Sequence, residues 1–412
     1  MDIAFGVTAT ALVLFMTPGL AFFYGGLVRA RSVISMMMMS FGTIGLVAVL
    51  WILYGFSMSG VDSPFAFSGN PFADIGLAAT LAGESANTDL VGVAYGSTFA
   101  IITVALISGS IADRAKFGSW LLFAGAFATL GYFPIAAWVW GGGWVESLGE
   151  LLGMPDVIDY AGGLAVHMNA GAAALALAFV LGRRLGFQKG SHRPHNVPFV
   201  LLGAAILWFG WFGFNVGAEW EDNMAGAGLI AINTIGCTAA SILAWMAVEK
   251  IKDGKPTAVG AASGAVAGLV AITPACANLT PGWALLLGVF SGAICALAIE
   301  LKYRLKFDDS LDVVGLHLVA GFIGTIYLGF FAIETGLFFG GGVGQLVVQL
   351  VSTVGVVVYA FLVALVVGFV IEKTVGFRLT NEDEVVGADT VEHGEKAYEY
   401  ELAETGTATT QS

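Results

Sequence analysis

The chain has 412 residues, of which 57% are hydrophobic and 11% are charged, and its mean hydropathy is +0.85. Soluble domains carry about 25% charged residues, so this composition excludes an ordinary soluble protein and predicts a chain that lies mostly in lipid. The net charge of −13 is concentrated near the C-terminus, where residues 381–412 carry nine Asp and Glu residues and one Lys. The acidic balance therefore describes a predicted tail and not the membrane body.

Apolar runs along the chain predict an all-α membrane protein with eleven transmembrane helices. Most runs reach the ~20 residues that a bilayer-spanning helix needs, and the eighth, which ends near Pro274, is the shortest. The predicted spans are residues 3–28, 32–58, 90–112, 117–139, 159–182, 197–218, 225–248, 257–275, 282–301, 311–333 and 343–371.

The basic residues predict the orientation of these spans. Every Lys and Arg follows an odd-numbered span, whereas the connections after even-numbered spans carry only acids. The positive-inside rule places basic connections in the cytoplasm, so we expect the N-terminus outside and the C-terminus inside. The chain then divides into a membrane domain, 1–378, and an acidic cytoplasmic tail, 379–412.

Two histidines lie inside predicted spans, His167 in the fifth and His317 in the tenth, and each follows an aspartate, Asp159 or Asp309, by eight residues. Five is an odd number, so spans 1–5 and 6–10 insert in opposite orientations. This pattern predicts an inverted repeat, with span 11 added and a site near the midplane between the halves. Ionisable residues within a span mark a functional site by default.

The same four residues also have structural interpretations. A buried histidine can be satisfied by a backbone carbonyl, and aspartate is a favoured N-cap at the start of a helix. A neutral imidazole carries one donor and one acceptor nitrogen. If His167 and His317 meet, they form a polar track in an otherwise apolar channel.

Aromatic side chains cluster at the predicted outward ends of three spans. An interfacial aromatic belt explains any one of them. Together, on spans that would surround the fifth, they predict a cation–π vestibule followed by a hydrophobic constriction. The residues are Tyr95 and Phe99, Trp140 before three glycines, and Trp211, Phe214 and Asn215.

Catalysis and nucleic-acid binding find no support in the sequence. There is no P-loop and no G-x-S-x-G motif, so we predict neither catalytic residues nor a nucleic-acid partner. Cys237, Cys276 and Cys295 have no paired spacing and indicate neither disulfides nor a metal site. We expect no cofactor.

These residues resemble the ammonium transporter / Rh family, and its bacterial and archaeal ammonium transporters more than the Rh proteins. The resemblance covers nearly the whole chain. The matching segments are residues 159–163 with His167, Trp140 with 141–143, 208–215 with Gly217, 273–275, 312–317 and 393–398.

The resemblance implies a homotrimer in the plasma membrane with one pore per subunit. Trp140 and Phe99, with Tyr95 beside them, would form an external ammonium site that Asp159 supports. Phe99 and Phe214 would form a phenyl gate. NH4+ would lose its proton at this mouth and cross as NH3 past the twin histidines.

Four further residues, Trp211, Asn215, Asp309 and Asp312, would support the pathway. The tail resembles the family's cytoplasmic segment that meets a PII-type signal protein, although its composition also fits a disordered solubilising tail.

One position departs from the family pattern. Members usually carry Ser after Asn-x-Gly in the sixth span, and this chain has Ala218. Phe214 and Ala218 are four residues apart and would share a helix face. Glu219, Glu221 and Asp222 follow and are expected to raise the cation concentration in the outer loop.

Three competing functions remain open from the sequence. An ammonium sensor of the same fold would signal through its tail. A redox protein would bind haem between His167 and His317. A sodium-coupled carrier would need sodium for uptake.

Overall fold

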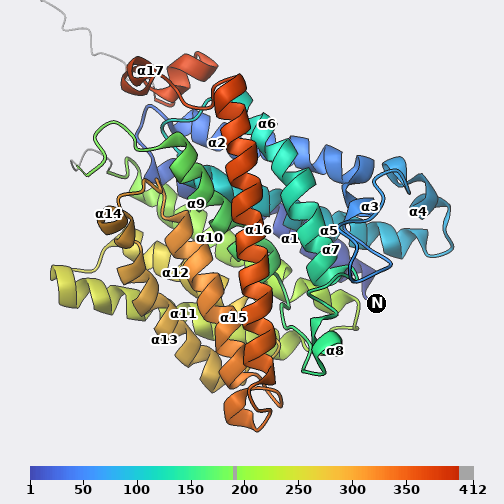
Figure 1. Cartoon of the computed structure of the whole chain (residues 1–412). Coiled ribbons are helices and arrows are strands. Elements are labelled where there is room, and N and C mark those ends of the chain that lie inside the picture. Colours follow the sequence, from blue (N-terminus) through green and yellow to red (C-terminus); the bar gives the residue numbers. More distant parts are fainter. Residues whose placement is uncertain (189–192, 399–412) are drawn as a thin grey trace, which may run out of the picture.

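The computed structural model describes residues 1–188 and 193–398, and over these ranges it is a bundle of helices without a β-strand (Figure 1). The longer helices are α1 (Ile3–Leu27), α2 (Val33–Leu50), α5 (Ala86–Ile107), α6 (Phe117–Phe127), α7 (Phe133–Trp140), α9 (Asn169–Leu181), α10 (Val197–Asn215), α11 (Ala227–Asp253), α12 (Ala258–Ile272), α13 (Pro281–Ala298), α15 (Ala320–Phe331) and α16 (Gly344–Thr374). The short ones are α3 (Phe56–Met58), α4 (Ala78–Ala82), α8 (Leu148–Leu152), α14 (Leu301–Leu305) and α17 (Asn381–Val386).

Ten helical segments among the described residues are long and apolar enough to cross a membrane. The eighth predicted span is the exception, because α12 has only 15 residues. Pro274 has no N–H to continue the helical hydrogen bonds, and the chain passes into turns after Ile272. α12 nevertheless packs among α10, α11, α13 and α15, within the bundle.

π-helical turns interrupt four of the long helical segments. They lie at Trp51–Gly55 after α2, Ala128–Tyr132 between α6 and α7, Gly163–Met168 before α9, and Val314–Val319 before α15. Such turns are rare and occur frequently at functional sites. The last two contain His167 and His317.

The segments that carry the two histidines run antiparallel to each other. Gly163, at the start of the first, lies against Thr325, and Gly171 lies against Leu318. Arg183, just after α9, donates to the backbone oxygen of Lys306, before the second segment, at 2.8 Å. A Cβ on Gly171 would lie 2.5 Å from the nitrogen of Leu318, so the close approach depends on glycine. An antiparallel course is expected for the fifth and tenth spans, with or without an inverted repeat, because successive spans alternate in direction.

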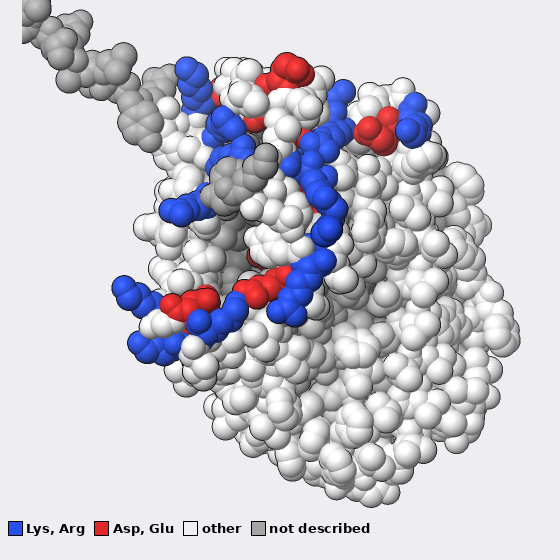
Figure 2. All heavy atoms as spheres, turned by 60° about the vertical axis from the view of Figure 1, so that its left-hand side comes forward, with Lys and Arg blue, Asp and Glu red and all other residues white. Residues whose placement is uncertain are grey.

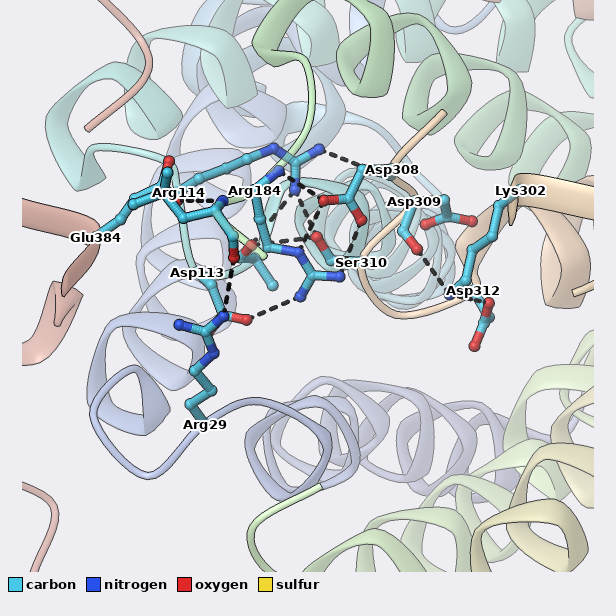
Figure 3. A network of polar contacts seen from close by, with 12 residues as sticks. Arg29, Asp113, Arg114, Arg184, Lys302, Asp308, Asp309, Ser310, Asp312 and Glu384 are labelled. Carbon is cyan, nitrogen blue, oxygen red and sulfur yellow. Dashed lines mark hydrogen bonds and ion pairs between the residues drawn. The ribbon is translucent and has the colours of Figure 1, made fainter. Parts of the chain in front are cut away.

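On the face that Figure 2 shows, charged side chains gather at one end and leave most of the surface uncharged. Arg184 is the centre of a buried network there (Figure 3). Its guanidinium donates to Asp113 at 2.9 Å and to both carboxylate oxygens of Asp308 at 2.9 and 3.0 Å. Arg114 donates to the Ser310 hydroxyl at 2.5 Å and to the Asp308 carbonyl at 2.7 Å. Three connections between spans are thereby joined.

The electrostatics of this network favour the charged form of Asp308. Burial by itself raises the pKa of the carboxyl, but the hydrogen bonds and charge of Arg184, with the charge of Arg114, lower it to about 2. A carboxylate that is paired in this way stabilises the fold only while it is ionised.

The segment after α16 packs on the same end of the bundle. The Asp389 carboxylate accepts from the N–H of Ser35 at 2.8 Å, in the first turn of α2. Glu392 accepts from the N–H of Phe117 at 2.8 Å, at the first residue of α6. Glu384 accepts from the N–H of Leu185 at 3.0 Å. Residues 379–398 of the predicted tail therefore contact the membrane body, and residues 399–412 lie outside the described residues.

We predict that Arg184→Met lowers the free energy of unfolding by about 3 kcal/mol, because it leaves the buried Asp308 without its guanidinium partner. Thermal denaturation of the detergent-solubilised protein measures this change. Lys252→Met is the control: its ion pair with Glu300 is more than one-third exposed, so the loss should stay below about 1 kcal/mol. Equal losses for the two variants would contradict the assignment.

The stability that Asp308 contributes should also depend on pH. The carboxyl has a pKa of about 2 in the folded protein, against about 3.9 for an ordinary Asp. Its contribution is therefore complete above about pH 4 and is lost as the pH falls towards 2. Arg184→Met should weaken the acid dependence of the denaturation midpoint in that window, and an unchanged dependence would argue against the pairing.

Candidate functional site

A wide pocket of about 610 Å³ opens at the end of the bundle where α5 begins and α7 ends. We call it the aromatic pocket. It lies at the opposite end of α5 from Arg114 and the charged network. Its lining includes Trp51, Tyr95, Phe99, Tyr132, Trp140, Tyr160, Phe214 and Ala218, with Asp89 and Glu221.

Two phenyl rings form the floor of the aromatic pocket. Phe99 and Phe214 stack with ring centroids 4.3 Å apart and an interplanar angle of 16°. Trp140 meets Phe99 edge-on at 6.0 Å, and Tyr95 meets it at 4.9 Å. The Tyr95 hydroxyl donates to the carbonyl of Phe214 at 3.1 Å, which fixes the two helices that carry the stacked rings. The predicted grouping of these four residues is therefore present.

Beyond the phenyl pair lies a much smaller space, which we call the histidine cavity. Its volume is about 10 Å³, room for about one water-sized molecule. Its lining is apolar apart from the two imidazoles and the indole N–H of Trp211. The lining residues are Met16, Leu20, Phe23, Ile102, Leu106, His167, Leu207, Trp211, Phe214, Val266 and His317.

The two histidines contact each other directly. The Nδ1 atoms of His167 and His317 are 3.3 Å apart, and their ring planes differ by 28°. Two lone pairs cannot bond, so one Nδ1 carries a hydrogen and donates to the other. Trp211 stacks on His167 at 5.5 Å and donates from its indole N–H to Thr273 at 2.8 Å. The His167 ring therefore packs against both Trp211 and His317, in a space with room for about one water-sized molecule.

An aspartate upstream of each histidine accepts hydrogen bonds at the start of the helical segment that carries the histidine. The buried Asp159 carboxylate accepts from the N–H groups of Gly163, Leu164 and Ala165, the last two at 2.9 and 3.0 Å. Asp309 accepts from the N–H of Val314 at 2.7 Å. The first N–H groups of a helix have no partner within it, and a carboxylate satisfies them well. Both aspartates therefore satisfy N–H groups at the start of a helical segment, as the structural interpretation expects, although the N-cap positions themselves are Gly162 and Val313.

The segment that contains Asp159 is held from two sides. Gln349, buried on α16, accepts from the N–H of Ile158 and donates to its carbonyl, both at 2.8 Å. Trp140 donates from its indole N–H to the Asp159 carbonyl at 2.9 Å. A pocket residue and the long helix α16 therefore fix the same short stretch of backbone.

The remaining predicted residues lie elsewhere. Trp211 belongs to the histidine cavity and not to the wider pocket. The Asn215 amide is turned towards α11, where it donates to Thr234 at 3.0 Å. Asp309 and Asp312 line a separate pocket of about 400 Å³, in which Lys302 donates to Asp312 at 2.5 Å. Figure 3 shows Lys302 between these two aspartates.

Ala218 lines the aromatic pocket together with Phe214, but the two do not share one helix. α10 ends at Asn215, and a 3-10 turn covers Gly217–Trp220. The expectation that Glu219 is a charge of the outer loop is not met, because its side chain is 6% exposed. Glu221 does reach the pocket lining.

Sequence reasoning did not single out Gln349, Tyr160 or Trp51. A glutamine within an apolar span is a signal that could have identified Gln349, since polar groups in lipid need partners. Tyr160 lies in the segment 159–163 that carries the family resemblance, but it was given no role of its own, and nothing in the local sequence marks Trp51 as a pocket residue.

The fold and site define a polytopic membrane protein in which a wide aromatic mouth leads to a narrow cavity that holds two contacting histidines. Comparison with known proteins then gives the family. The Ammonium Transporter Family matches residues 4–398, so the chain belongs to this family and transports ammonium.

Individual relatives agree with this assignment. An ammonium transporter of Mycobacterium tuberculosis is 47% identical, over 98% of this chain and 91% of its own. The structure of Candida albicans Mep2 has a TM-score of 0.83 and 31% identity, over 92% of this chain and 86% of its own. A structure described as a sensor Amt protein has a TM-score of 0.86 and 25% identity, over 95% and 98% of the two chains.

We predict that Gln349→Leu slows ammonium uptake and lowers the free energy of unfolding by about 2 kcal/mol, because the buried N–H and carbonyl of Ile158 lose their partner. Uptake into proteoliposomes and thermal denaturation measure the two effects. Ser352→Ala, one turn along α16, is the control: its hydroxyl donates only within its own helix, to Val348 at 2.8 Å and Gln349 at 3.1 Å. Uptake equal to wild type in Gln349→Leu would show that the clamp does not position the site.

Proposed function

We propose that the protein binds NH4+ in the aromatic pocket, removes its proton there, and conducts NH3 through the histidine cavity. The observation that carries this mechanism is the stacked pair of Phe99 and Phe214 above a cavity of about 10 Å³. Aromatic faces attract a cation, whereas a narrow apolar cavity raises a barrier to any ion. The two spaces therefore favour different forms of the same molecule.

Selectivity follows from this change of form. Ammonium and potassium are similar in size and charge, so a pore that passes ions cannot easily separate them. Only ammonium can discard its charge and continue as a neutral molecule. The contacting imidazoles offer NH3 a donor and an acceptor inside an otherwise apolar wall, which lowers the cost of leaving water.

We propose an arrangement in the membrane that completes this mechanism. The aromatic pocket faces outward. The opposite end, which carries the Lys and Arg residues and the network around Arg184 and which we call the basic end, faces the cytoplasm, as the positive-inside rule favours. α12 serves as the eighth of eleven spans, because the turns that follow it reach the backbone of Tyr160, whose N–H donates to the Pro274 carbonyl at 3.2 Å. Residues 1–378 form the membrane domain of a homotrimer in the plasma membrane, with residues 379–412 as its cytoplasmic tail.

The basic end is also the proposed site for a PII-type signal protein. The packed segment 379–398 exposes Glu382 and Glu395, and it lies at the end of the bundle where the basic connections gather. A pull-down with purified PII-type protein tests the contact. The chain without residues 399–412 and the chain without 385–412 separate the two parts of the tail, and binding unchanged in both would exclude the tail as the contact.

The geometry weakens the haem alternative, because the imidazoles contact each other and the cavity between them has no room for a macrocycle. The sensor alternative shares the fold. Ammonium uptake into proteoliposomes, measured with and without sodium, decides between transport, sensing and sodium coupling.

We predict that the double variant His167→Ala, His317→Ala loses ammonium-over-potassium selectivity. The two alanines enlarge the cavity and remove its polar pair, so water and ions can enter. Ammonium- and potassium-evoked currents in proteoliposomes measure the change. Retention of both rate and selectivity would contradict the assignment of the pore.

We predict that Ala218→Ser lowers the half-saturating ammonium concentration about fivefold and leaves the maximal rate nearly unchanged. A serine oxygen in the pocket lining would accept a hydrogen bond from the bound cation, worth about 1 kcal/mol at a wet site. Concentration-dependent uptake measures the effect. No gain, or complete loss of transport, would show that position 218 does not face the cation.

A further inference from the structure

A buried carboxylate lies behind the wall of the aromatic pocket. Glu219 is 6% exposed, although it stands in the short connection between α10 and α11 among charged, exposed neighbours. One carboxylate oxygen accepts from the Tyr160 hydroxyl at 2.5 Å, and the other accepts from the N–H of Gly226, at the start of α11. A buried carboxylate is costly unless it is paired, and neither of these partners is a cation.

Tyr160 connects this carboxylate to the pocket. It lines the aromatic pocket together with Ala218 and Glu221, and it follows Asp159 directly in the segment that Gln349 holds. A hydroxyl that donates to a carboxylate becomes a better acceptor for a second donor, because hydrogen bonds in a chain polarise one another. Tyr160 therefore extends the influence of Glu219 into the pocket wall.

We propose that Glu219, acting through Tyr160, supplies the fixed negative charge of the cation site in the aromatic pocket, where Ala218 provides no side-chain oxygen. Glu219 is a positioning residue in this assignment, since Tyr160 separates it from the bound cation. The inference rests on the proposed binding of NH4+ in this pocket. It names the residues that give the cation its counter-charge.

A fixed charge behind the wall differs from the exposed carboxylates of the same connection. Glu221 and Asp222 are exposed, so dissolved salt screens their attraction for a cation. Glu219 is shielded from counter-ions by Tyr160 and by the connection itself, and buried charges are screened much less. Ionic strength therefore separates the two contributions.

The alternative is that Glu219 only caps α11. Its bond to the Gly226 N–H suits this structural task, and loss of a cap lowers stability without a specific effect on cation binding. Tyr160→Phe distinguishes the two roles, because it removes the link to the pocket and leaves the bond between Glu219 and Gly226 in place.

The experiment measures ammonium uptake by the full chain in proteoliposomes at about 20 mM and about 500 mM lithium chloride, ionic strengths at which exposed charges are weakly and strongly screened. Glu219→Gln and Tyr160→Phe should each raise the half-saturating ammonium concentration about tenfold at both salt concentrations, as the loss of a charge-assisted interaction predicts. Their maximal rates should stay within about twofold of wild type, because the interaction is made with the bound cation. The double variant should be no worse than the more affected single variant, since coupled residues are not additive.

Asp222→Asn is the matched control, and its smaller effect should disappear at the higher salt concentration. A half-saturating concentration unchanged in Tyr160→Phe overturns the proposal, as does an effect of Glu219→Gln that salt abolishes. A fall in maximal rate and thermal stability alone would also overturn it and assign Glu219 to the cap of α11. Absence of ammonium uptake by the wild-type chain would instead contradict the transport function itself.

Discussion

The contact between the Nδ1 atoms of His167 and His317 sets the demands on the rest of the structure. Two imidazoles can share one hydrogen only if their nitrogen atoms stay within about 3.5 Å of each other, and these two come from segments 150 residues apart. The first turn of each segment therefore has to be held in place. Asp159 and Asp309 do this by accepting hydrogen bonds from N–H groups in those turns. The two segments pack antiparallel through Gly171. Asp159 and Asp309 therefore lie at opposite ends of the packed pair, and the two histidines meet between them.

Attraction of a cation and exclusion of a cation are physically opposed tasks, and the proposed mechanism assigns them to different places. The aromatic pocket is wide and has Asp89 and Glu221 in its lining, so it would stabilise a charge. The histidine cavity is narrow and apolar, so it would reject the same charge. Phe214 belongs to the lining of both spaces. In the proposed mechanism, the change from NH4+ to NH3 therefore takes place across one stacked pair of rings.

Much of this design was readable in the sequence, because it is carried by repeated spacing and by span periodicity. The eight-residue interval before each histidine located the cavity, and the aromatic positions at span ends located the pocket. What the sequence did not show depends on contacts between distant segments. Tyr160 and Glu219 are 59 residues apart, and Gln349 is 191 residues from Ile158. Nor does spacing reveal which way a side chain turns, as with Trp211 and Asn215, because neighbouring helices decide that direction.

The caps on α2 and α6 have a consequence for the order in which the protein is made. The first turns of these helices are satisfied by Asp389 and Glu392, which leave the ribosome several hundred residues after the helices themselves. Until then the exposed N–H groups at the starts of both helices can bond only to water or to transient partners. The basic end of the bundle is therefore the last part to reach its final form. In a nascent chain that stops short of residue 389, the helices α2 and α6 are complete, but the N–H groups in their first turns lack these carboxylate partners.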